Sequence, residues 1–251
     1  MQFSKWHALG NSYLVVEQPD AGEITPTRAR QLCSVETGLG SDGVIEVIRR
    51  DGANAVVTIW NPDGSTAEMS GNGTRIAARW LAAEAGTSEV SIETSGRRIA
   101  ARMLDELMTD TDVGEVAVGE PEDLDGMELT TASVGNPHAV IRLDAATRED
   151  LVRIGPIVET HPRFPERTNV QLVRVDGLHD LTVLVWERGA GETSASGSSS
   201  VAAAAVAVAR GWCESPVTVH LPGGDLLVRL AGGLASLTGP AERIAWGSTE
   251  L

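Results

Sequence analysis

The chain has 251 residues, 42% of them hydrophobic, which is enough to bury a substantial core in one or two domains. Its formal net charge of −15 argues against nucleic acid or an anionic membrane as a partner. Cys33 and Cys213 belong to no CxxC motif or Cys/His cluster, so we expect no metal or redox site. The chain does not begin like a signal peptide, and its most apolar run, 201–209, is too short to span a bilayer. These features predict a soluble, cytoplasmic protein.

The first half predicts short strands around one long helix. An amphipathic helix is expected over 26–34, with Cys33 as a buried core residue. β-branched runs bounded by turn residues predict strands over 56–60 and 90–94. The helix between them covers 74–85 and stops at Gly86.

The middle of the chain is acidic, and the second half repeats the pattern of the first. Ten acidic and no basic residues lie between Asp105 and Glu128, which we interpret as a solvated connector. Strands follow over 181–186 and 217–221. The helix between them, over 198–210, is apolar nearly all round, so a sheet must wrap it.

The two halves align at a nearly constant offset. Trp186 follows Trp60, and Ser196 follows Ser70, by the same 126 positions. Such ordered matches indicate an internal duplication. We therefore predict a mixed α/β fold of two duplicated, pseudo-symmetric lobes, 1–115 and 116–251. Each lobe is a mixed sheet wrapped around a central helix, with the active-site cleft between them.

Each half places Ser-Gly where its long helix begins, in MSGNGTR (69–75) and ASGSSS (195–200). Helix N-termini expose backbone N–H groups and a positive dipole end, which suit a carboxylate. One interpretation is a pair of N-cap serines without chemistry. The other is two like groups on opposite walls of a cleft, which suits inversion at an α-carbon: one group removes the proton and the other returns it to the opposite face.

Motifs along nearly the whole chain resemble the diaminopimelate epimerase family: KWHALGN, GLGSDG, NPDGSTAEMSGNGTR, GNPH, RTN, ERGAGETSASG and LPGG. The resemblance implies an isomerase of lysine and cell-wall precursor synthesis. Such an enzyme interconverts LL- and meso-diaminopimelate by two-base α-proton transfer, with no cofactor and no metal. It also implies a small-molecule amino-acid substrate, with a homodimer as one option for assembly.

The resemblance assigns site residues by position. Ser70 and Ser196 fall on the acid/base positions, with His138 and Glu187 as the polar groups beside them. The implied substrate-binding set comprises Asn11, Asn61, Gly71, Asn72, Asn136, Asn169, Glu187, Arg188, Gly197 and Ser198. Without the resemblance, Asn11 and Asn136 would pass as turn residues and His138 as a core histidine.

The sequence departs from the family at its centre, because the family has cysteine where Ser70 and Ser196 stand. A helix N-terminus can lower a thiol pKa to a usable value, whereas an aliphatic hydroxyl starts far above that range. Serine therefore needs a base beside it, for which His138 and Glu187 are the candidates. The GNSY stretch (10–13) also replaces the family's Gly-Asn-Asp-Phe.

Three hypotheses follow from the serines. They are engineered replacements, or native residues of an isomerase that still works, or marks of a cleft kept for another purpose. The alternatives to the epimerase are thus a non-catalytic amino-acid-binding homologue and a racemase or isomerase of a different amino acid.

Overall fold

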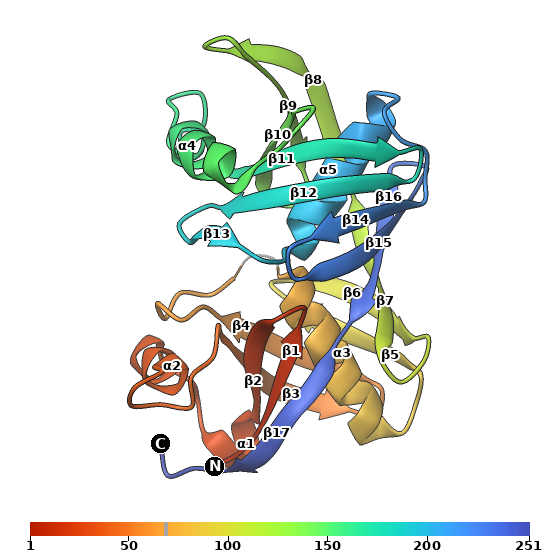
Figure 1. Cartoon of the computed structure of the whole chain (residues 1–251). Coiled ribbons are helices and arrows are strands. Elements are labelled where there is room, and N and C mark those ends of the chain that lie inside the picture. Colours follow the sequence, from red (N-terminus) through yellow and green to blue (C-terminus); the bar gives the residue numbers. More distant parts are fainter. Residues whose placement is uncertain (68–69) are drawn as a thin grey trace. The chain divides into compact units, whose positions relative to one another are not determined.

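The computed structural model describes residues 1–67 and 70–251; Glu68 and Met69 of the MSGNGTR motif lie outside the described residues. The chain forms two compact units, residues 1–112 together with 239–251 and residues 113–238 (Figure 1). We call them unit 1 and unit 2. Within the described ranges, no helix is both long and apolar enough to cross a membrane.

Unit 1 is a mixed sheet with one long and two short helices. Its strands, in spatial order, are β17 (Glu242–Ser248), β1 (Gln2–Ala8), β2 (Asn11–Glu17), β3 (Val44–Asp51), β4 (Asn54–Trp60), β5 (Glu89–Thr94), β6 (Arg97–Met103) and the first part of β7 (Met108–Glu115). Its helices are α1 (Gln18–Ala21), α2 (Pro26–Cys33) and α3 (Gly71–Ala85). The final strand of the chain thus pairs with the first.

Unit 2 is also a mixed sheet, with two helices and one additional short strand. Its strands, in spatial order, are β8 (Ala117–Leu124), β9 (Met127–Ser133), β10 (Pro137–Arg142), β11 (Asn169–Gly177), β12 (Asp180–Glu187), β14 (Val217–Leu221), β15 (Gly224–Ala231) and β16 (Leu234–Pro240). A short strand, β13 (Gly191–Thr193), pairs with β12. The helices are α4 (Arg148–Glu159) and α5 (Gly197–Ala209).

The order of strand directions is identical in the two units. From β17 to β7, and again from β8 to β16, successive pairs are antiparallel, antiparallel, parallel, antiparallel, parallel, antiparallel and antiparallel. Two unrelated sheets would not share this series. The predicted mixed α/β fold with a duplicated unit is therefore confirmed.

Each long helix is the centre of its unit. α3 contacts β1, β2, β4, β5 and β6, and α5 contacts strands from β8 to β12 as well as β14 and β15 (Figure 1). In α5 every residue from Val201 to Val206 is buried, because alanine and valine cover all sides of the helix. The sequence prediction of a wrapped, apolar helix is confirmed.

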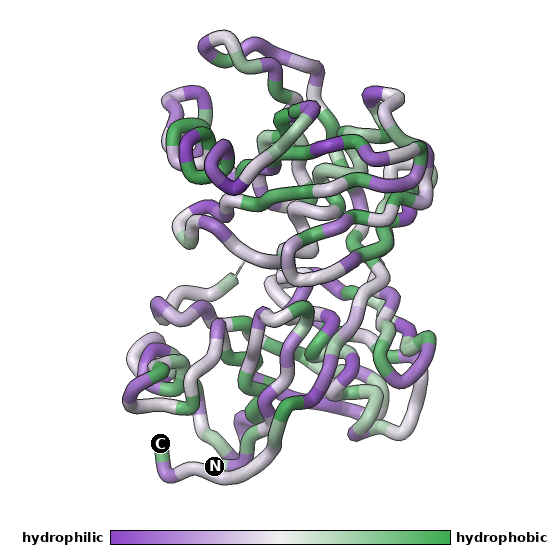
Figure 2. The backbone as a smooth tube through the Cα atoms, in the orientation of Figure 1, coloured by the Kyte–Doolittle hydropathy of each residue, from purple (hydrophilic) through white to green (hydrophobic). Residues whose placement is uncertain are grey.

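The acidic stretch does contain the boundary between the two units, after Asp112, but it is built of strands. Residues 108–115 and 117–124 are β7 and β8, and β8 forms a hairpin with β9 whose tip is largely hydrophilic in Figure 2. In β7, Thr109, Thr111 and Val113 alternate inward, so Asp110 and Asp112 point outward. The sequence does not show this alternation as an apolar pattern, because polar threonines occupy two of the inward positions and the outward positions are charged.

The wrapping of α5 predicts a sharp positional difference between two identical substitutions. Ala203 is fully buried, so Ala203→Leu should overpack the core and lower the free energy of unfolding by about 1–3 kcal/mol. Ala209 is exposed in the last turn, and Ala209→Leu should change that free energy by less than about 0.5 kcal/mol. Urea unfolding of both variants measures the difference, and equal losses would contradict the wrapped helix.

Candidate functional site

Ser70 caps the helix α3 of unit 1. Its backbone is extended, its Oγ accepts a hydrogen bond from Gly73 N at 3.0 Å, and its carbonyl accepts one from Thr74 N at 2.9 Å. A side chain at Gly73 would place its Cβ 3.0 Å from Ser70 Oγ, so glycine keeps the cap open. The backbone of Gly71 and Asn72 forms the first turn, where helical N–H groups have no partner within the helix.

A buried arginine stabilises this first turn of α3 by hydrogen bonds. Arg75 is fully buried, and its guanidinium donates to Asn72 Oδ1 at 2.7 Å and to Gly71 O at 3.1 Å. Asn72 Nδ2 in turn donates to Asn11 Oδ1 at 3.1 Å. Burial lowers the pKa of Arg75 to about 10, so the side chain keeps its positive charge at neutral pH. The cation and the helix dipole both favour an anion at the start of α3.

Tyr13 is the second side chain at Ser70, and it was not among the predicted site residues. Its hydroxyl lies 3.1 Å from Ser70 Oγ, and its ring is buried on β2. A Cβ at Gly43 would come within 2.4 Å of the Tyr13 ring and 2.6 Å of Trp60 O, so only glycine leaves room there. The available signal was the repeat itself, since Tyr13 precedes His138 by the same 125 positions that separate Asn11 from Asn136.

Asn61, which the resemblance assigns to the substrate, hydrogen-bonds within its own turn. Its Nδ2 donates to Ser65 Oγ at 2.9 Å, and its backbone N–H donates to Ser65 O at 2.8 Å. Ser65 is held in turn by Asp63 Oδ1. The structure thus joins Asn11, Asn72 and Ser70 to the start of α3, and places Asn61 at the end of β4 in a separate polar turn.

Ser196 occupies the corresponding N-cap of α5 in unit 2 but is held differently. It is buried, and its side chain makes no capping hydrogen bond to the helix. The carboxyl beside it is that of Glu187, at the end of β12. Burial raises the pKa of Glu187, and the Ser196 hydroxyl lowers it, opposing that shift. Gly197 and Ser198 begin the helix.

His138 is neutral and holds Asn136. Gln171 Nε2 donates to His138 Nδ1 at 3.1 Å, which leaves the proton on Nε2 to be donated to Asn136 Oδ1 at 2.9 Å. Burial lowers the pKa of His138 to about 3. Both ring nitrogens of His138 are thus engaged, one by Gln171 and the other by Asn136.

Asn169 and Glu159 brace the turn that carries Glu187 and Arg188. Asn169 Nδ2 donates to Pro137 O at 2.9 Å, and its Oδ1 accepts from Arg188 N at 3.0 Å. The buried Glu159 accepts from Trp186 Nε1 and from Gly189 N, both at 2.7 Å, and pairs with Arg167. Unit 2 therefore holds Asn136 through His138 and Gln171, and the Arg188 turn through Asn169 and Glu159. Sequence reasoning missed Gln171 and Glu159.

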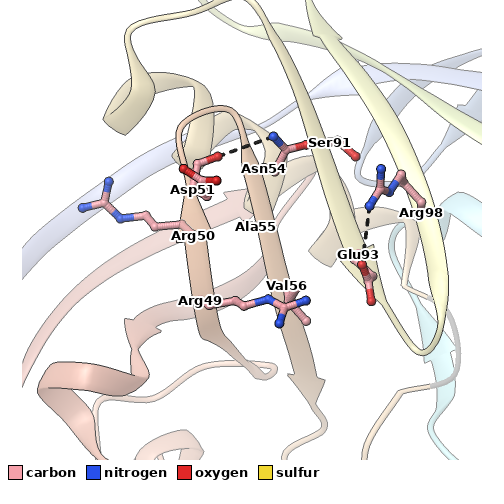
Figure 3. Close-up of a pocket in the computed structure, with 9 residues that line it drawn as sticks. All are labelled: Arg49, Arg50, Asp51, Asn54, Ala55, Val56, Ser91, Glu93 and Arg98. Atoms are coloured by element: carbon pink, nitrogen blue, oxygen red, sulfur yellow. Dashed lines mark hydrogen bonds and ion pairs between the residues drawn. The ribbon is translucent and has the colours of Figure 1, made fainter.

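A further polar pocket among the described residues involves none of the candidate site residues. A pocket of about 120 Å³ in unit 1 is lined by exposed residues such as Arg49 and Arg50, and Arg98 faces Glu93 across 3.9 Å (Figure 3). Arg50 forms an ion pair with Glu17, with 2.8 Å between Arg50 Nε and Glu17 Oε2. Within the described residues, no three His, Cys, Asp or Glu side chains converge as metal ligands.

Comparison with known proteins identifies relatives over the full chain. The family model described as diaminopimelate epimerase matches residues 3–121 and 130–244. "Diaminopimelate epimerase 2" of Nostoc sp. is 38% identical, covering 100% of this chain and 97% of the relative. "Diaminopimelate epimerase" of Pseudomonas entomophila is 35% identical, covering 100% and 99%.

Solved structures of low identity share the fold. A predicted epimerase from Pseudomonas aeruginosa superposes with a TM-score of 0.79 at 18% identity, covering 100% of this chain and 99% of that one. A hydroxyproline epimerase from Agrobacterium vitis gives 0.72 at 16% identity, covering 98% and 90%. At these identities the likeness concerns the fold alone.

The buried, neutral His138 predicts a pH-dependent stability. Its folded-state pKa of about 3 lies below its ordinary 6.5, so between these values the unfolded chain binds one proton more than the folded one. This contribution to stability is fully present above pH 6.5 and is lost as the pH falls towards 3, by up to about 1.4 kcal/mol per pH unit. Urea unfolding from pH 7 to 4 should show a flatter decline for His138→Gln than for the wild type. Parallel declines would contradict a neutral His138.

Proposed function

The chain belongs to the diaminopimelate epimerase family, a family of cofactor-independent amino-acid isomerases of lysine biosynthesis, and we propose that it interconverts LL- and meso-diaminopimelate by proton transfer at the α-carbon. In this proposal Ser70 and Ser196 stand at the family's cysteine positions and exchange the proton. The substrate is a small amino acid with a second amino-acid head group, which the amides of Asn11, Asn61, Asn136 and Asn169 and the side chain of Arg188 are proposed to recognise.

The Ser196–Glu187 pair is the observation that carries the proposal. An aliphatic hydroxyl alone is too weak an acid to leave a usable base at neutral pH. A neighbouring carboxylate that accepts the hydroxyl proton removes that difficulty, and Glu187 is proposed for this role. As Ser196 Oγ takes the α-proton, the hydroxyl proton passes to Glu187: the Cα–H bond and the serine O–H bond break, while a new serine O–H bond and a glutamic acid O–H bond form. A raised pKa makes the buried Glu187 carboxylate a better proton acceptor.

The two helix starts support the binding of an α-carboxylate. Proton removal from an α-carbon sends negative charge onto the adjacent carboxylate, and backbone N–H groups fixed at a helix N-terminus stabilise that charge without reorganising. Gly71 and Asn72 begin α3, and Gly197 and Ser198 begin α5. The buried charge of Arg75 strengthens the first of these positions.

The proposal is tested by α-proton exchange in deuterated water. The wild type and the Ser70→Cys/Ser196→Cys variant are incubated with LL-diaminopimelate, and the α-proton signal and the meso product are followed by NMR. Exchange by the wild type supports an epimerase that works with serine. Exchange by the variant alone would indicate a scaffold whose native serines do not catalyse. Absence of exchange and of binding by both proteins, the latter measured by calorimetry, would refute the substrate assignment and favour another amino acid.

Glu187→Gln should slow the exchange while preserving the shape of the site. The amide still lies beside Ser196 but cannot take up its proton, so the exchange rate should fall by about 10²–10⁴-fold. Binding of the substrate should weaken much less. Glu214→Gln, on an exposed residue of the same unit, is the matched control and should exchange at the wild-type rate. A Glu187→Gln variant with wild-type exchange would remove Glu187 from the mechanism.

A further inference from the structure

The two serines of the proposed site have different titratable partners. Position 61 corresponds to position 187 in the repeat, but it holds asparagine, whose amide is bonded to Ser65 and cannot exchange a proton at neutral pH. Among the described residues, this repeat position thus offers an amide in unit 1 where it offers the Glu187 carboxyl in unit 2. The titratable side chain hydrogen-bonded to Ser70 is Tyr13, which corresponds to His138 of unit 2.

We propose that Tyr13 is the proton partner of Ser70, so that the Tyr13 and Ser70 hydroxyls act as a relay in unit 1. This inference rests on the proposed function and adds the source of the second proton. Tyr13 acts through Ser70, and its role is to supply and withdraw the proton that the serine exchanges.

The hydrogen bonds around Ser70 fit a relay. A serine hydroxyl has one proton and two acceptor sites, and Gly73 N–H occupies one of the acceptor sites. Tyr13, 3.1 Å away, can fill the second and donate its proton to Ser70 Oγ. The proton of the Ser70 hydroxyl is then directed away from both Tyr13 and Gly73. The geometry thus allows both protons to be ordered in one direction, with Tyr13 as the donor to Ser70.

Packing fixes the phenol in this position. The Tyr13 ring lies against Gly43, where any side chain would collide with it, and Leu14 N donates to Gly43 O at 3.1 Å beside it. The ring is buried, with 6% of its surface exposed. A buried, clamped ring leaves the hydroxyl few positions other than the one at Ser70.

The acidities of Tyr13 and Glu187 determine which pair gives a proton first and which pair takes one. A phenol is ordinarily a much weaker acid than a carboxyl, so the phenol holds its proton more strongly. The Tyr13–Ser70 pair therefore begins as the proton donor and the Glu187–Ser196 pair as the acceptor. When Ser70 gives its proton to the α-carbon, a Cα–H bond forms, the serine O–H bond breaks and is restored from Tyr13, and the negative charge ends on the phenolate. Proton exchange with water restores both pairs.

Tyr13 is the single tyrosine of the chain, which allows a direct measurement. The ultraviolet absorption of tyrosinate reports its ionisation with no background from other tyrosines. Ser70→Ala removes the hydrogen-bond partner and should shift the phenol pKa, whereas Thr109→Val, which removes a different buried hydroxyl of unit 1, should not. An unchanged titration in Ser70→Ala would overturn the pairing, whatever the enzymatic activity.

Tyr13→Phe tests the relay in catalysis. Phenylalanine keeps the ring against Gly43 and removes only the hydroxyl, so substrate binding should stay within about twofold while α-proton exchange falls by about 10²-fold or more. Thr109→Val should exchange at the wild-type rate. In a Ser70→Cys background the loss caused by Tyr13→Phe should shrink to less than about tenfold, because a thiol forms its own base without a partner.

The outcomes separate this inference from the proposed function. Wild-type exchange that is unaffected by Tyr13→Phe would overturn the relay and leave the epimerase intact. A loss of the same size in the serine and cysteine backgrounds would also overturn it, since that pattern indicates a structural role. Absence of exchange by the wild type would refute the serine-based epimerase and, with it, any catalytic relay.

Discussion

Each unit depends on burying one helix on nearly all of its sides. In α5 the apolar residues leave no polar stripe, so strands must surround the helix and the sheet has to curl. The helix leaves carbonyl groups unpaired in its last turn and N–H groups unpaired in its first turn. Polar side chains gather at the first turn, and the position of the candidate chemistry at the starts of α3 and α5 follows from the packing of the core.

The two units share the order and direction of their strands more closely than they share their side-chain contacts. Trp60 and Trp186 are equivalent, and each indole donates to a buried glutamate, yet Glu46 comes from β3 and Glu159 from α4. The serines behave in the same way, since Ser70 has a phenol from β2 and Ser196 a carboxyl from β12. After a duplication, the need for a buried partner persists, while the element that supplies it is free to change.

The repeat made much of this architecture predictable. A constant offset locates equivalent strands and helices without knowledge of their partners, and the long helices begin within a few residues of the expected starts. The constant offset also identified Ser70 and Ser196 as equivalent positions. The acidic strand β8 stayed hidden because mostly exposed, charged residues give no apolar alternation to detect. The contact of Tyr13 with Ser70 was missed because the two residues lie 57 positions apart on different elements, although the repeat does make Tyr13 equivalent to His138.

The closing strand of unit 1 has a consequence for synthesis on the ribosome. Unit 2 is continuous, whereas unit 1 needs the last residues of the chain, because β17 pairs with β1 from Gln2–Ser248 to His7–Glu242. The half that emerges first is thus completed last, after the second half has been translated. Until then one edge of β1 presents unpaired backbone groups, the kind of edge to which foreign strands add. A nascent chain stalled before residue 242 would carry a finished second half and an open first one.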